Sequence, residues 1–228
     1  MLHICVDYIT HTGLLMFVIS KLTKDVSLTP TFFSDFNADL KYRFCSIVHS
    51  FIVSLALSLW FVGYNIDIYD LYLFSFAFTM YDICNMCADT HRRNQAKPIA
   101  PPIKKHDNDI FIFHHIVMMI GITCMYNVTN PEILMIGNAL FLSEWSTPFL
   151  NISILLHHCK LDNSLIYKFN NILVMITYTV FRIVLFAINA YKMYEHSMFY
   201  TMLTVIFFGL NLKWYRKLLQ KCFKSHSV

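Results

Sequence analysis

Long apolar runs separated by short polar stretches are the main pattern along this 228-residue chain. Most runs hold about 20 residues, the length of an α-helix that crosses a bilayer. The first run is the least apolar, because His3, Asp7 and His11 interrupt it. The pattern predicts an all-α fold, a multi-pass transmembrane bundle of about seven helices. The predicted segments are residues 2–20, 44–63, 68–88, 110–127, 133–156, 166–190 and 197–213.

The composition agrees with a membrane protein. Apolar residues make up 57% of the chain and charged residues only 14%, whereas a soluble domain carries about a quarter charged residues. Five glycines and six prolines leave little room for linkers. We therefore expect an N-terminal helix with its loop at 1–40, one six-helix core domain at 41–217 and a basic tail at 218–228.

The basic residues predict how the chain is oriented. Sixteen of the 18 Lys and Arg fall in the loops 21–43, 89–109 and 157–168 or in the C-terminal tail. If seven segments cross, these regions share one side of the membrane, and basic residues accumulate on the cytosolic side. The long loops and the C-terminus should therefore be cytosolic. Because the basic residues are divided among several loops, we do not expect a nucleic-acid partner.

Polar residues inside the apolar segments are the candidates for function. A charge in hydrocarbon costs about 2.5–3.5 kcal/mol on insertion scales, so each one needs a partner or a cavity. Depths can be counted from the flanking loops at about 1.5 Å per helical residue. Four helices then place one such group at a similar depth in the cytosolic half: His49, Asp82, His114 and Asn151. This alignment predicts a polar cavity, or a polar lock between helices, open toward the cytosol.

Glu144 and Arg182 come out deeper, at about 20 Å from the cytosolic ends of their segments. Neither charge is tolerable alone at that depth, so we expect them to pair, either as part of a site or only to fix the packing of two helices. Asn138 and Asn211 are further polar residues within segments. The complete set of candidate cavity residues is His49, Asp82, Asn85, His114, His115, Glu144, Asn151 and Arg182.

The adjacent histidines in "IFIFHHIVMMIG" allow more than one role. They lie about 100° apart around a helix, so one should face the cavity while the other bonds a neighbouring helix. A neutral imidazole could act as a general base on a substrate amine or hydroxyl. The second pair, His157 and His158, falls at the membrane boundary and is typical of an interfacial anchor. Two pairs are too few for a histidine-rich metal centre, so we expect neither a metal nor a resident cofactor.

Several stretches together resemble the TLC domain. This family groups translocating-chain-associated membrane proteins, longevity-assurance ceramide synthases and a ceroid-lipofuscinosis protein. The resemblance runs from about residue 41 to 217, and the E-x-S-x-P-F-x-N core carries most of it. The matching stretches are "YRFCSIVHSFIV", "MYDICNM", "FIFHHIVMMIG", "GNALFLSEWSTPFLN", "NNILVMITYTVFRI" and "LNLKWYRKLL".

The resemblance implies a six-helix core in an endomembrane such as the endoplasmic reticulum, and work connected with lipids. In the ceramide synthases, the histidine pair belongs to a motif associated with acyl-CoA-dependent N-acylation of a sphingoid base. On this chain that role would fall to His114 and His115, with Asp82 as an orienting partner and acyl-CoA as co-substrate.

The synthase motif continues into an H-D-x-x-D run, whereas this chain reads "FLSEWSTPFLN" in the following helix. The pattern is more similar to the branch called TLC domain-containing proteins, which is linked to membrane lipid composition and trafficking. Three functions therefore stay open: a lipid-binding regulator, a lipid acyltransferase, and a chaperone or translocon-associated factor. Membrane lipids are the expected partners, and assembly with further copies of the chain stays open.

Overall fold

The computed structural model describes residues 38–95 and 106–224, and these residues form six long helices without a strand. The all-α prediction is confirmed. The predicted first segment, residues 2–20, lies outside the described residues. Two of the six long helices are interrupted near their middle by a different helical turn. The elements are α2 (Ala38–Phe61), α3 (Ile68–Gln95), α4 (His106–Tyr126), α5 (Pro131–Phe141) with η1 (Leu142–Trp145) and α6 (Ser146–His158), α7 (Leu165–Thr177) with η2 (Tyr178–Val184) and α8 (Leu185–His196), and α9 (Met198–Lys224).

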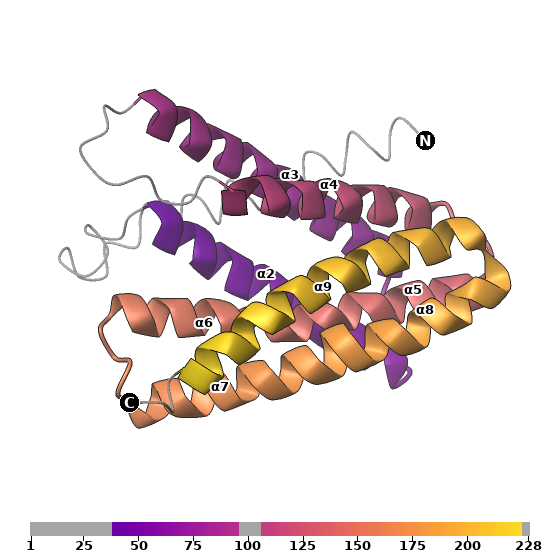
Figure 1. Cartoon of the computed structure of the whole chain (residues 1–228). Helices are drawn as coiled ribbons and strands as arrows, with labels where there is room; N and C mark the ends of the chain where they lie inside the picture. The colour runs from indigo at the N-terminus through magenta and orange to yellow at the C-terminus, as the bar shows by residue number, and fades with distance from the viewer. Residues whose placement is uncertain (1–37, 96–105, 225–228) are drawn as a thin grey trace.

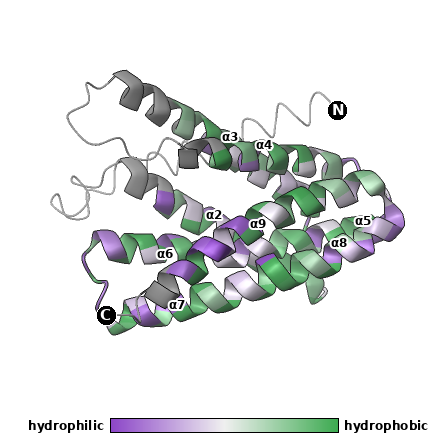
Figure 2. Cartoon of the chain, viewed as in Figure 1, coloured by the Kyte–Doolittle hydropathy of each residue, from purple (hydrophilic) through white to green (hydrophobic). Residues whose placement is uncertain are grey.

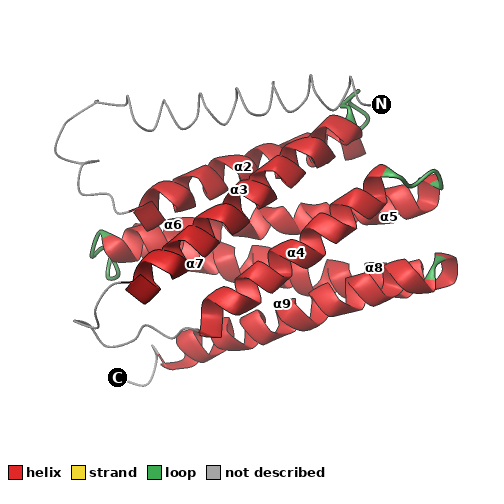
Figure 3. Cartoon of the chain, turned by 90° about the horizontal axis from the view of Figure 1, so that it is seen from above, coloured by secondary structure: helices red, strands yellow, loops and turns green. Residues whose placement is uncertain are grey.

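The helices pack lengthwise into one bundle, and α2 and α3 cross α8 and α9 at an angle in the view of Figure 1 (compare Figure 3). The most extensive contacts between helices are those of α2 with α6, α3 with α4, and α8 with α9. Short connections at 62–67, 127–130 and 197 join the helices at one end of the bundle, which we call the opposite end. The basic end is the other one, where α2, α4 and α7 begin and α3, α6 and α9 finish.

Local signals explain where several helices begin and end. The Asn130 side chain accepts hydrogen bonds from the N–H groups of Glu132 and Ile133, and proline follows it at the first helical position. Both features favour a helix N-terminus. The Ser164 side chain caps α7 in the same way. After α2, Gly63 adopts a φ of 96°, a left-handed conformation that glycine reaches without strain.

All six long helices of the described residues are longer than the apolar pattern predicts, and three of them show this clearly at one end. α2 begins at Ala38, α3 continues to Gln95 and α9 continues to Lys224. The apolar pattern marks only the part of a helix that suits hydrocarbon, and Lys, Arg and Gln are good helix formers beyond it. The first residues of the predicted basic tail, 218–224, therefore belong to α9.

Three of the long helices are both long and apolar enough to cross a membrane: Arg43–Phe61, Pro131–His158 and Leu165–His196. The apolar part of α4, Ile110–Tyr126, is shorter. Apolar residues dominate the middle of the bundle in Figure 2, and hydrophilic residues gather at the helix ends and on the C-terminal half of α9.

The interior of the bundle is unusually polar. In the described part of the chain, 16 polar or charged residues are buried, as many as the buried apolar ones. Many large apolar side chains face outward instead, including Leu165, Ile166 and Phe169. Exposed apolar surface of this extent is typical of contact with lipid. The described residues therefore form an all-α membrane bundle with a polar core.

Two interruptions occur where charged residues enter the core. Pro148 has no N–H to donate to the carbonyl of Glu144, four residues earlier, so the regular α-helical ladder is broken there. The preceding residues form the 3₁₀ turn η1, and the Ser146 N–H bonds to the carbonyl of Ser143. The second interruption is the π-helical turn η2, which carries Arg182. Such π-turns occur frequently at functional sites.

Candidate functional site

Six of the predicted site residues lie at one depth in the middle of the bundle. They stand 11 to 14 residues from the opposite end of their helices, which corresponds to about 17–21 Å. Electrostatic interactions link His49 to His115, His115 to Glu144, and His114 to Arg182. The sequence placed Glu144 and Arg182 deeper than the histidines and Asp82, but in the structure all of these residues lie at a similar depth. We call the following residues the charged layer: His49, Asp82, His114, His115, Glu144 and Arg182.

Asp82 and His115 form the closest ion pair of this layer. The Nε2 atom of His115 lies 2.6 Å from Oδ2 of Asp82, joining α4 to α3. On the other side of the ring, Nδ1 lies 2.7 Å from the carbonyl oxygen of Phe111. A carbonyl only accepts, so Nδ1 carries a proton and donates it. Nε2 faces the carboxyl group of Asp82, so both ring nitrogens of His115 are engaged.

Aromatic rings form the closest printed contacts of His49 and His114. The His49 ring stacks on Phe78, with 3.9 Å between centroids and 9° between planes. The His114 ring meets Trp214 and Phe207 of α9 edge-on, at 5.0 and 5.3 Å. Each has one buried ring nitrogen, Nε2 of His49 and Nδ1 of His114, without a hydrogen-bond partner among the described residues. These two nitrogens retain unused hydrogen-bonding capacity at the centre of the bundle.

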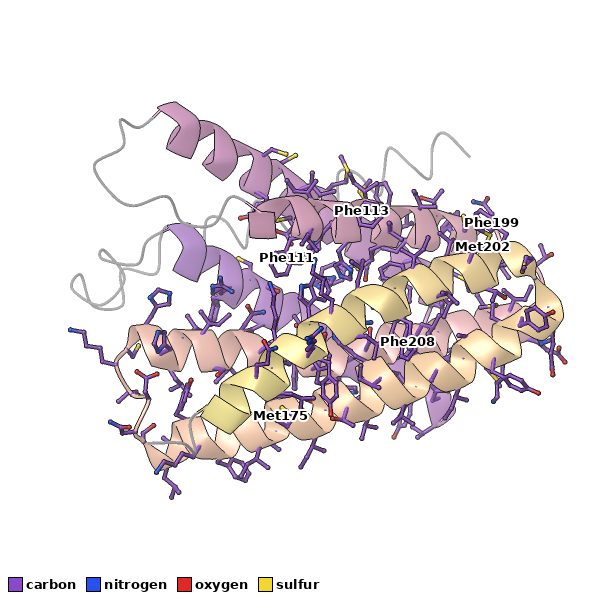
Figure 4. The ribbon with its side chains drawn as sticks, in the orientation of Figure 1. Phe111, Phe113, Met175, Phe199, Met202 and Phe208 are labelled. Carbon is purple, nitrogen blue, oxygen red and sulfur yellow. The ribbon has the colours of Figure 1, made fainter. Side chains whose placement is uncertain are left out.

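The aromatic surroundings of His114 come from two helices. Phe111 lies one turn before His114 on α4 and points toward α9 (Figure 4), where its ring stacks on Trp214 at 5.2 Å and 16°. His114 and His115 are perpendicular to each other, with 5.4 Å between ring centroids. The prediction that one histidine bonds a neighbouring helix is confirmed for His115. His114 packs against α9.

Arg182 is the most heavily hydrogen-bonded residue of the layer. Its Nε donates to the Ser146 hydroxyl at 2.6 Å, Nη2 to the Thr147 hydroxyl at 2.8 Å and Nη1 to Oδ1 of Asn211 at 3.2 Å. The predicted partner, Glu144, lies 3.9 Å from Nη2. Pairing is confirmed, but the nearest partners are neutral oxygens. Arg182 thereby joins η2 to α6 and α9 while Glu144 balances its charge.

Comparison with known protein families identifies one domain over nearly the whole chain. The model of the TLC domain matches residues 5–220. The chain belongs to the TLC-domain family. No curated protein matches it. The buried histidines, Asp82, Glu144 and Arg182 thus all lie within the TLC domain, and a relation to membrane lipids follows from this family at a general level.

Two predicted residues of the TLC domain stand apart from the charged layer. Asn151 lies seven residues from the basic end of α6, where its Nδ2 donates to Ser46 at 3.1 Å and its Oδ1 accepts from Arg43 at 3.3 Å. It therefore links α6 to α2 nearer the basic end. The side chain of Asn85 lies outside the described residues.

Several partners in the TLC domain are not marked as site residues by the sequence, although Asn211 stands out there as a polar residue within an apolar segment. Ser146, Thr147 and Asn211 hold Arg182, and Trp214 and Phe207 enclose His114. Serine and threonine are common in membrane helices, where they usually bond their own backbone, so nothing in their sequence context distinguishes them. The π-helical geometry of η2 has no sequence signature either.

The described residues of the TLC domain contain no group of three or more His, Cys, Asp or Glu side chains arranged to hold a metal ion. The second histidine pair lies at the end of α6. His157 is 68% exposed and its Nδ1 lies 2.5 Å from Oδ1 of Asp162. This position agrees with an interfacial role and separates the two histidine pairs by the length of half the bundle.

Proposed function

We propose that this TLC-domain protein acts in membrane lipid homeostasis, and that the charged layer binds the polar headgroup of a lipid. The headgroup would enter through a polar cavity that opens at the basic end, in the cytosol. The protein would reside in the endoplasmic reticulum or another endomembrane. Binding rather than turnover is the activity that we favour.

The unused ring nitrogens of His49 and His114 carry this proposal. A buried polar atom without a partner costs about 1–3 kcal/mol, so it is tolerated where a ligand or water supplies the missing bond. Both nitrogens lie in a layer whose charges compensate each other, because Asp82 balances His115 and Glu144 balances Arg182. Such a layer suits a headgroup that forms several hydrogen bonds.

A second candidate function is a ceramide-synthase-like N-acyltransferase that uses acyl-CoA. The contact between Asp82 and His115 favours it, because carboxylate–imidazole pairs orient general bases. Both nitrogens of His115 are engaged, by Asp82 and by Phe111. The base would therefore be His114, through Nδ1, and His115 with Asp82 would hold its position.

The test compares two histidine pairs of the same chain. Cells would express the wild type, His114→Ala/His115→Ala or His157→Ala/His158→Ala at matched levels, and lipids would be quantified in the cells and in the purified proteins. The proposal predicts that only the first variant loses its co-purified lipid and changes the cellular lipid profile. Equal profiles for all three proteins would contradict it.

Acyltransfer is tested separately. The purified wild type would be incubated with a sphingoid base and acyl-CoA, beside His114→Ala and Asp82→Asn. Formation of an N-acylated product that falls by orders of magnitude in His114→Ala would favour the enzyme. Bound lipid without any acyl-CoA consumption would favour the binding function and reject the enzyme.

A further inference from the structure

A second set of buried polar groups lies between the charged layer and the opposite end. Ser54 stands seven residues before the end of α2, and Ser75 seven residues after the start of α3. Asn138 stands seven residues after the start of α5, and Asn189 seven before the end of α8. Each of the four is therefore about 10 Å along its own helix from the end that lies on this side of the bundle. We call Ser54, Ser75, Asn138 and Asn189 the neutral layer.

Each member of the neutral layer has hydrogen-bonding capacity that the described residues leave unused. The Oγ atoms of Ser54 and Ser75 and the Nδ2 atoms of Asn138 and Asn189 are buried without a hydrogen-bond partner in the part of the chain that the structure describes. Three of the residues are 0% exposed and Asn189 is 3% exposed. Four such atoms at one depth, from four different helices, are uncommon in a folded protein.

The four helices are neighbours at this depth. α2 packs on α3 and α5, and α5 packs on α8. A hydrogen bond from the Tyr72 hydroxyl to Oδ1 of Asn138 ties α3 to α5. All four side chains are buried within this group of helices.

The surroundings of the neutral layer are apolar. Val53 and Leu57 of α2 and Met193 of α8 lie close by in sequence and belong to one buried apolar cluster. The immediate sequence neighbours of the four residues are apolar or small, so no ionisable side chain adjoins them along the chain. An apolar site with a few convergent polar groups is the usual composition of a ligand site. The absence of neighbouring charge favours an uncharged ligand.

We propose that the neutral layer is a second binding site, which takes the uncharged oxygens of a neutral lipid. The two amide groups donate to a hydroxyl or an ester carbonyl oxygen, and the two serine hydroxyls donate or accept. The ligand class is a lipid such as a diacylglycerol, whose chains contact the apolar cluster. This site does not depend on the function of the charged layer.

The test uses a photoactivatable diacylglycerol and a phosphatidic acid with the same photoactivatable chains. The full-length protein in lipid nanodiscs would be crosslinked with each probe, and the labelled peptides would be mapped by mass spectrometry. We expect diacylglycerol to label peptides of α2, α3, α5 or α8 near the neutral layer. The charged probe should label these peptides at least about tenfold less, because its phosphate would have to be buried without a partner.

Variants decide whether the four groups bind the probe. Ser54→Ala/Ser75→Ala/Asn189→Leu should lower diacylglycerol labelling about tenfold, since it removes three hydrogen-bonding groups. The matched control is Thr204→Ala. Thr204 is buried on α9 six residues from the same end, and its hydroxyl already bonds the carbonyl of Tyr200 at 2.8 Å. The control should label as the wild type does.

Three results would overturn the proposal. They are equal labelling of the triple variant and the wild type, equal labelling by both probes, and labelling no higher than background, which would mean that water alone fills the site. If the triple variant does not fold, Ser75→Ala alone serves the comparison. His114→Ala/His115→Ala should keep its diacylglycerol labelling, which separates this test from that of the charged layer.

Discussion

The charged layer and the neutral layer are buried in the same bundle but satisfy their polar groups differently. In the charged layer, Arg182 is held by four side chains and Asp82 lies 2.6 Å from His115. In the neutral layer, four polar atoms are left over. A charge cannot be buried without compensation, whereas an amide or hydroxyl can be at a smaller cost. The comparison teaches that the ion pairs of the first layer fasten helices together, whereas the neutral layer, like the ring nitrogens of His49 and His114, keeps bonding capacity in reserve.

The largest expected effect is on Arg182. Arg182→Leu removes the bonds that join η2 to α6 and α9 and leaves Glu144 without its balancing charge. Breaking a buried pair in this way costs about 3–5 kcal/mol. Thermal unfolding of the purified protein should show a large loss of stability, while Lys192→Leu, exposed on the same long helix, should not. Equal melting temperatures for both variants would contradict the fastening role.

Alanine variants of Asp82 and His115 should lower the free energy of unfolding by a smaller amount, and their effects should be coupled. Each single alanine variant leaves one buried partner unsatisfied, at about 1.5–3 kcal/mol. The double variant should lose less stability than the two single variants added together. The difference, which is the coupling energy, should be about 1–3 kcal/mol. Denaturant unfolding of the four proteins in the cycle measures this. Additive losses would mean that the pair does not act as a unit.

Tyr72→Phe should have an intermediate effect at the neutral layer. It removes only the hydroxyl that donates to Asn138, at a net cost of about 1 kcal/mol. Tyr69→Phe is the control, because this neighbour is 41% exposed. The difference in unfolding free energy between the two variants measures the bond. Equal unfolding free energies for the two variants would mean that the bond between Tyr72 and Asn138 does not stabilise the protein.

The smallest effect should be that of Ser75→Ala in lipid-free detergent. Its hydroxyl has no partner in the described part of the chain, so its removal should change stability by no more than about 0.5 kcal/mol, or raise it. Thr79→Ala is the matched comparison on α3, since the Thr79 hydroxyl bonds the Ser75 carbonyl at 2.7 Å. A loss of several kcal/mol in Ser75→Ala would show that its hydroxyl is already bonded.

The sequence predicts the bundle well because lipid imposes a simple rule on it. Helices that cross hydrocarbon must be long and apolar, so the six described helices fall close to the predicted segments. Asp82, Glu144 and Arg182 are equally visible, since a charge within an apolar run needs a partner. The pairing of Glu144 with Arg182 follows from that reasoning alone.

The depth of the charged layer was predicted less accurately than the helices and the pairing of Glu144 with Arg182. The expected depths used loop residues such as Arg43 and Asp89 as helix ends, but α2 and α3 continue beyond both. The neutral layer has a weaker signal still. Asn138 stands out in an apolar run, whereas Ser54 and Ser75 resemble any small residues of a membrane helix. Which serines retain an unused hydroxyl depends on packing between helices.

The π-helical turn at Tyr178–Val184 has a consequence for how related chains should be aligned. A π-turn holds one residue more than the α-helical turn it replaces, so it amounts to an insertion within a continuous helix. A relative lacking that residue would need its alignment gap inside this turn to keep Asn189 and Met193 inward. A gap placed in a loop would instead rotate all of α8 by about 100° relative to the core.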